Sequence, residues 1–200
     1  MSSAARRESP LFSRREEKIE VAGLSVCEQP WRTLLNLRGR PDDANYSLAV
    51  KEATGLSLPA ANEFNTDGGR LLAWLGPDEF LFVGNDCDAV RVEKKLRDLL
   101  SGVASALTDV SCGFTTLVVS GAGARDFLAK GWALDLHPRA FRPGHCAQSF
   151  LAKAPVLLLQ RDAAPVFELI VRRSFVDYVW AWSEKSLGRW RVKNSRNRDK

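Results

Sequence analysis

Residues 71–84 constrain the fold most strongly, because they predict a β-hairpin. Their sequence is Leu-Leu-Ala-Trp-Leu-Gly-Pro-Asp-Glu-Phe-Leu-Phe-Val-Gly. Aromatic and β-branched residues, which favour strands, flank residues 76–79. Pro77 presets the φ angle of the second turn position, and Asp78 favours a tight turn. The hairpin indicates antiparallel pairing, but by itself it indicates no chemistry.

Hydrophobic periodicity predicts further strands and helices along the chain. Residues 89–103 form the clearest amphipathic helix, and its single apolar stripe fits packing on one face of a sheet. Other helices are expected to begin near Pro41, Ala124 and Ser174. Strands are predicted at residues 33–39, 104–109, 114–120, 146–153, 156–161 and 166–171. This order predicts an α+β fold: a single domain of split βαβ (ferredoxin-like) units with a mostly antiparallel sheet.

The last predicted helix is apolar around most of its circumference. Ser174 is expected to cap it, with Asp177 at the third helical position. Such a helix is buried on more than one side, either inside its own domain or against a partner protein, and the sequence allows both. The two arginines before it fit either a contact with an anion or partner, or charge at the rim of the sheet. The candidate subunit interface therefore comprises Phe175, Tyr178, Trp180, Trp182, Arg172 and Arg173.

The composition is that of an ordinary soluble globular protein. The chain has 200 residues, of which 45% are hydrophobic and 26% are charged, and this length suits one domain. No apolar run approaches the roughly 20 residues that a membrane helix needs. The first 18 residues lack the apolar segment of a secretory signal. We therefore expect a cytoplasmic protein with no membrane partner.

Positive charge is concentrated at the C-terminal end. Residues 189–200 hold six basic residues and one acid, which equals the formal net charge of +5 for the whole chain. A nucleic-acid surface needs a basic patch interleaved with aromatics on a folded face, so this distribution argues against a nucleic-acid partner. We expect a flexible N-terminal arm over residues 1–20, a domain over 21–188, and a basic tail over 189–200. The tail fits either a solvated terminus or a contact with an acidic surface of a partner.

No catalytic, cofactor or metal site is predicted in this chain. Residues 120–126 resemble the start of a dinucleotide fingerprint, but Asp126 replaces the third glycine and would repel phosphate. The only two histidines, His137 and His145, lie in a proline-rich connection, and the neighbouring Cys146 would point to the opposite face of a strand. The four cysteines lack metal-ligand spacing and are expected to be buried, reduced thiols. By chemistry alone, an interaction or binding module is expected.

Several blocks between residues 34 and 182, taken together and in order, resemble the gamma subunit family of heterotetrameric sarcosine oxidase. No single block is diagnostic, whereas their ordered co-occurrence is specific. They are Leu35-Asn36-Leu37-Arg38-Gly39, Trp74-Leu75-Gly76-Pro77-Asp78-Glu79-Phe80, Asp109-Val110-Ser111, residues 121–128 with Ala124-Arg125-Asp126, Leu134-Asp135-Leu136-His137-Pro138 with Phe141 and Pro143-Gly144, and Arg172-Arg173-Ser174 with Tyr178, Trp180 and Trp182.

The resemblance implies a fold similar to the folate-binding domain of the glycine-cleavage T protein. It also implies a non-catalytic structural (gamma) subunit of an oxidoreductase that works with alpha, beta and delta subunits. That holoenzyme oxidatively demethylates sarcosine to glycine, with H2O2 and formaldehyde or methylene-tetrahydrofolate as the other products. The implied cofactors are FAD, FMN, NAD, tetrahydrofolate and zinc, all in other subunits. The alternative is an independent folate or small-ligand-binding module.

Overall fold

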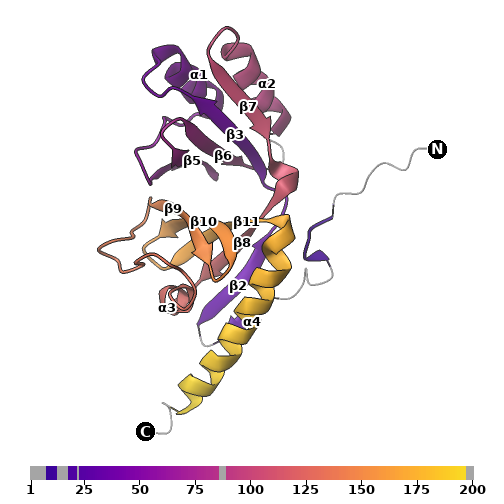
Figure 1. Ribbon diagram of the computed structural model, residues 1–200, viewed down its shortest axis with the longest axis vertical. Coiled ribbons are helices and arrows are strands. Elements are labelled where there is room, and N and C mark those ends of the chain that lie inside the picture. The colour runs from indigo at the N-terminus through magenta and orange to yellow at the C-terminus, as the bar shows by residue number, and fades with distance from the viewer. Residues whose placement is uncertain (1–7, 13–17, 22, 86–88, 197–200) are drawn as a thin grey trace, which may run out of the picture.

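The computed structural model describes residues 8–12, 18–21, 23–85 and 89–196 (Figure 1). In this part of the chain, strands and helices form two antiparallel sheets with helices on their outer faces. The elements are β1 (Ile19–Val21), β2 (Leu24–Gln29), β3 (Thr33–Gly39), α1 (Ala44–Thr54), β4 (Phe64–Asp67), β5 (Arg70–Gly76), β6 (Glu79–Gly84), α2 (Ala89–Leu99), β7 (Ser105–Asp109), the 3-10 turn η3 (Ser111–Gly113), β8 (Phe114–Ser120), α3 (Ala124–Leu128), β9 (Cys146–Leu151), β10 (Ala154–Asp162), β11 (Val166–Arg172) and α4 (Arg173–Arg196).

The first sheet is a split βαβ unit with one added strand. Its spatial order is β4-β5-β6-β3-β7, and every paired strand runs antiparallel. Following the chain, β3, α1, β5, β6, α2 and β7 make the ferredoxin-like succession predicted from the sequence. Val92 and Leu96 of α2 pack with Tyr46 and Val50 of α1 on the outer face of this sheet. The α+β, mostly antiparallel prediction is therefore confirmed.

The remaining strands form a second sheet, so the expectation of one sheet is corrected to two. Its order is β1-β2-β8-β11-β10-β9, and α3 and α4 lie on its outer face (Figure 1). The inner faces of the two sheets share an apolar layer that includes Leu34, Leu71, Leu81, Leu157, Leu159 and Ile170. The four layers are thus helices, sheet, sheet and helices. Strands that are buried on both faces are apolar on both faces. Their sequences therefore lack the polar–apolar alternation that would have shown two separate sheets.

The predicted hairpin is β5–β6, and side chains from β3 fasten its turn. Asn36 donates from Nδ2 to Glu79 Oε1 at 2.7 Å. Arg38 donates to both carboxylate oxygens of Asp78, at 2.9 and 3.0 Å. Charge-assisted bonds of this kind fix geometry as well as adding energy. Two blocks that are far apart in the sequence, residues 35–39 and 74–80, are therefore one interlocked structural unit.

Helix α1 has the boundaries that its sequence favours. The Asp43 carboxylate accepts from the N–H groups of Asn45 and Tyr46, and Gly55 ends the helix in the left-handed conformation at φ +81°. The Tyr46 ring lies against Gly39 of β3 and is fully buried. Burial raises the pKa of Tyr46 to about 12, because the phenolate would lose its hydration.

Three expectations about the ends of the chain need correction. Helix α4 begins at Arg173, directly after β11, so Ser174 lies inside the helix and not at its cap. The same helix continues to Arg196, so residues 189–196 of the predicted tail are helical. In the predicted N-terminal arm, Ser9 and Leu11 are buried, so residues 8–12 are not loose. The other boundaries of the three-part division stay predictions.

Replacing Gly39 with alanine tests the contact between β3 and α1. A Cβ atom there would lie 2.3 Å from Cε2 of the fully buried Tyr46 ring, so the core must shift. We expect Gly39→Ala to lower the free energy of unfolding by about 1–3 kcal/mol in urea denaturation. Gly188→Ala in α4 is the control, because open space surrounds that position and the helix should gain up to about 1 kcal/mol. Equal effects of the two substitutions would contradict this packing.

Candidate functional site

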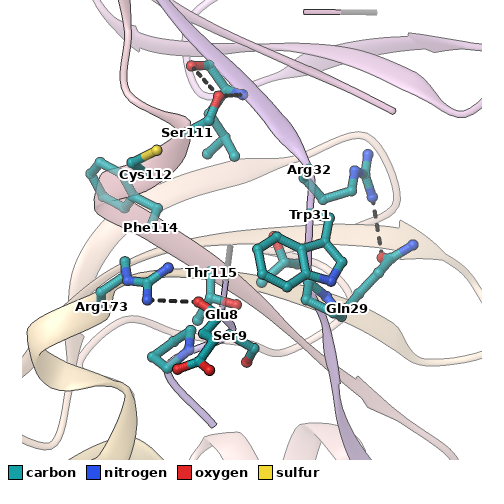
Figure 2. A pocket seen from close by; sticks show the side chains of 14 residues that line it. Glu8, Ser9, Gln29, Trp31, Arg32, Ser111, Cys112, Phe114, Thr115 and Arg173 are labelled. Atoms are coloured by element: carbon teal, nitrogen blue, oxygen red, sulfur yellow. Dashed lines mark hydrogen bonds between the residues drawn. The ribbon is translucent and has the colours of Figure 1, made fainter. Parts of the chain in front are cut away.

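A cavity of about 300 Å³ lies where four segments of the chain meet, and we call it the junction cavity (Figure 2). The N-terminal segment, the β2–β3 connection, the start of β8 and the start of α4 each contribute to its lining. Its main residues are Ser9, Trp31, Arg32, Phe114, Thr116 and Arg173. Figure 2 shows Phe114 and Arg173 on one side of the space and Trp31 on the other. The lining thus combines apolar rings with guanidinium and hydroxyl groups.

Arg32 supplies a buried positive charge in this wall. Its guanidinium donates to the carbonyl oxygens of Gly84 and Gly69, both at 3.2 Å, and to Gln29 Oε1 at 3.1 Å. The Glu168 carboxylate on β11 lies 3.9 Å away and also lies 3.4 Å from Arg161 Nε. Burial lowers the pKa of Arg32, and the charge of Glu168 opposes this shift. The side chain is therefore held rigidly and joins the two sheets.

The N-terminal segment is fastened over one side of the cavity. Ser9 Oγ donates to Glu28 Oε2 on β2, and Thr115 Oγ1 donates to the other oxygen of the same carboxylate at 2.5 Å. Arg173 Nη2 donates to the Glu8 carbonyl oxygen at 2.8 Å (Figure 2). These bonds explain why residues 8–12 pack against the domain.

Two features of the lining are unusual for a packed wall. Trp31 has φ +63°, a left-handed conformation that costs an ordinary residue roughly 1–3 kcal/mol. Thr116 is 1% exposed, and its hydroxyl has no hydrogen-bond partner among the described residues. A buried hydroxyl without a partner is costly in a folded protein. Both features lie where the β2–β3 connection meets the start of β8.

Sequence and structure comparisons identify the family. A family model described as the sarcosine oxidase gamma subunit family matches residues 38–187, which is most of the chain. The chain belongs to the sarcosine oxidase gamma subunit family. It is 33% identical over 171 residues to sarcosine oxidase subunit gamma from Corynebacterium sp. (strain U-96), covering 83% of this chain and 82% of the relative. It is 30% identical over 164 residues to subunit gamma from Arthrobacter sp, covering 81% and 79%.

Solved structures agree with this assignment. The fold matches a chain of heterotetrameric sarcosine oxidase from Corynebacterium sp. U-96, solved with pyrrole 2-carboxylate, with a TM-score of 0.84 and 29% identity. That match covers 92% of this chain and 96% of the other. The fold also resembles glycine cleavage system aminomethyltransferase T from Bartonella henselae, with a TM-score of 0.63 and 12% identity over 87% of this chain and 56% of that chain. The expected likeness to the T protein fold is confirmed.

The predicted interface residues of this gamma-family chain divide into two groups. Trp180 is 1% exposed, and Trp182 packs at a tilt against Phe127 with ring centroids 5.2 Å apart, so both pack into the chain's own core. Phe175 also packs partly against this core. Most of the apolar surface of α4 is therefore buried inside the domain.

The other predicted interface residues reach the surface or the cavity. Tyr178 is 39% exposed, and Arg172 is exposed with its guanidinium 5.3 Å above the Phe114 ring. Arg173 is half-buried and lines the junction cavity. Sequence reasoning missed Trp31, Arg32 and Thr116, because nothing in their local pattern shows that distant segments bring them together.

Residues in the blocks that resemble the family make contacts that stabilise the fold, and Arg125 is one of them. Arg125 of α3 donates to the carbonyl oxygens of Leu136 and Phe141 and to the side chain of Gln160, at 2.7 Å for the last. Its guanidinium also lies 5.3 Å from the centroid of the Phe167 ring. One arginine therefore fastens the connection over residues 134–144 to α3 and β10.

The remaining sequence candidates have structural roles. Gly121 has φ +109°, and a Cβ atom there would lie 1.8 Å from the Gly23 carbonyl oxygen, so this glycine permits close chain contact. The imidazole of His145 is within 2.9 Å of Arg142 Nε, and no cluster of three or more metal-ligating side chains occurs in the described ranges. Among the thiols, Cys146 is buried, with a pKa raised to about 12 by burial, whereas Cys112 is exposed, contrary to the expectation of buried thiols. Cys87 lies outside the described residues.

Removing the Arg125 side chain tests its role in fastening residues 134–144. We expect Arg125→Ala to lower the free energy of unfolding by about 2–3 kcal/mol, because the carbonyl groups and the buried Gln160 lose a charged donor. Amide hydrogen exchange over residues 134–144 should also accelerate. Arg139→Ala removes an exposed arginine from the same connection and should change neither quantity. Unchanged exchange in Arg125→Ala would show that other contacts hold this segment.

Proposed function

We propose that this chain is the structural gamma subunit of a heterotetrameric sarcosine oxidase. The observation that carries the proposal is the structural match over 92% of this chain and 96% of a chain of a heterotetrameric sarcosine oxidase. The assembled enzyme would oxidatively demethylate sarcosine to glycine, with H2O2 and formaldehyde or methylene-tetrahydrofolate as the other products. The reacting groups would lie in other subunits.

The contacts of the family blocks support a structural role. Arg38 and Asp78 fasten a turn, while Arg125 fastens the long connection to β10. Asp109 Oδ1 accepts from the Ser111 N–H at 2.8 Å, and Ser111 Oγ accepts from the Leu34 N–H at 2.9 Å, which ties β7 to β3. Residues occupied in this way are unsuited to catalysis. The family and structural matches also do not favour the alternative, an independent folate or small-ligand-binding module.

The partners and cofactors are proposed by family membership. We assign alpha, beta and delta subunits as partners, with FAD, FMN, NAD, tetrahydrofolate and zinc held by those chains. A cytoplasmic location is part of the same proposal. In the described part of the chain, no helix combines the length and apolar character that crossing a membrane requires.

The proposed contact with a partner subunit uses the outer surface at the start of α4. Phe175 and Tyr178 are three residues apart, so they share one face of the helix. Arg172 is exposed at the adjoining end of β11. An aromatic side chain beside an arginine is a common composition of interface centres. Trp180 and Trp182 would pack on the core side of this surface.

Co-expression with the other three subunits, followed by size-exclusion chromatography, tests the proposed function. We expect the chain to elute in a stoichiometric complex. A chain that always elutes alone, although folded, would contradict the proposal.

Tyr178→Ala tests the interface separately. We expect roughly thirtyfold weaker assembly, from a loss of about 2 kcal/mol at a buried aromatic contact, with unchanged unfolding of the isolated chain. Trp180→Ala should instead destabilise the chain itself by about 3–5 kcal/mol, because this side chain fills the core. Leu48→Ala, at a 64% exposed position on α1, is the control for assembly. Tyr178→Ala that assembles like Leu48→Ala would place the interface elsewhere.

A further inference from the structure

The junction cavity has the properties of a ligand site, and this goes beyond the proposed structural role. Its volume of about 300 Å³ suits a molecule of roughly ten heavy atoms. Small-molecule sites are mostly apolar and carry a few convergent polar groups. Here Pro30, Trp31 and Phe114 supply the apolar wall, and Arg32 and Arg173 supply the polar groups.

Arg173 is the group that can take an anion. A guanidinium has five N–H donors, and one of them is used by the Glu8 carbonyl oxygen at 2.8 Å. The planar fork therefore keeps donors for two parallel bonds to a carboxylate, which is its preferred bidentate geometry. Its half-buried position makes such a bond stronger than one in open water.

Arg32 strengthens the same preference from the wall of the cavity. Arg32 is 8% exposed and is held in place by Gly84, Gly69 and Gln29. Glu168 offsets its charge in part at 3.9 Å, so Arg173 carries most of the uncompensated charge.

One carboxylate lies near the site and opposes an anion. Glu8 lines the cavity and is exposed, so its charge is hydrated and weakens binding without preventing it. Its backbone carbonyl oxygen, not its side chain, bonds to Arg173. The side-chain charge can therefore be removed without breaking the bond that fastens the N-terminal segment.

We propose that the junction cavity binds a small free carboxylate with a planar apolar body. The carboxylate would pair with Arg173, and the planar body would lie between Trp31 and Phe114. Benzoate, with nine heavy atoms, is the simplest probe of this chemistry. Benzamide has the same shape without the charge.

Isothermal titration of the full-length chain with benzoate and benzamide tests the proposal. We expect saturable benzoate binding, with benzamide at least about tenfold weaker, because a charged hydrogen-bonded pair is lost. Arg173→Gln removes the charge and should weaken benzoate binding about tenfold. Glu8→Gln should strengthen it two- to threefold by removing a like charge.

A matched control separates the cavity from the rest of the surface. Arg139→Gln makes the same chemical change at an exposed position and should leave binding unchanged. Circular dichroism confirms that each variant is folded. The proposal fails if benzoate does not saturate, or if Arg173→Gln binds as tightly as the unaltered chain.

A carboxylate could also come from a partner subunit, and a second titration distinguishes the two sources. Benzoate should bind the assembled complex as it binds the chain. Binding to the isolated chain that disappears on assembly would overturn the assignment to a free ligand, because a partner side chain would then occupy the cavity. Binding to the isolated chain does not depend on whether the chain assembles as a gamma subunit, which size-exclusion chromatography decides separately.

Discussion

The apolar contact between the two sheets is the constraint on which the rest of the structure depends. Leu34, Leu71 and Leu81 from one sheet pack with Leu157, Leu159 and Ile170 from the other. Each such side chain contributes roughly 1.5–3 kcal/mol when fully buried. The outer faces of both sheets are covered by helices, so each sheet is a middle layer of the domain. The helices, connections and cavity are arranged around this double layer.

A buried ion pair crosses the same contact. Arg32 stands just before β3, and Glu168 lies in β11 of the other sheet, with 3.9 Å between their charged groups. A buried pair adds little net stability, but separating its members leaves an uncompensated charge. The pair therefore favours one relative position of the two sheets. The junction cavity lies beside this point, which explains why its inner wall is rigid.

Local chemistry made much of the fold predictable. Pro77 and Asp78 marked the hairpin turn, and Asp43 and Gly55 stand at the two ends of α1. The separation into two sheets could not be predicted, because β6 and β10 are apolar on both faces and show no alternation. The candidate site was harder to predict from the sequence than the fold. Its lining converges from four segments, and the strained backbone at Trp31 has no glycine to signal it.

Helix α4 changes the physical character of the basic C-terminal end. Leu187 is buried against the domain, and the helix continues to Arg196, beyond the sheets in Figure 1. Nine further helical residues extend about 13 Å at the usual rise of 1.5 Å per residue. A random coil fluctuates over a large volume, whereas a helix keeps a fixed direction. The angle between α4 and the sheets therefore decides where the backbone of residues 188–196 extends.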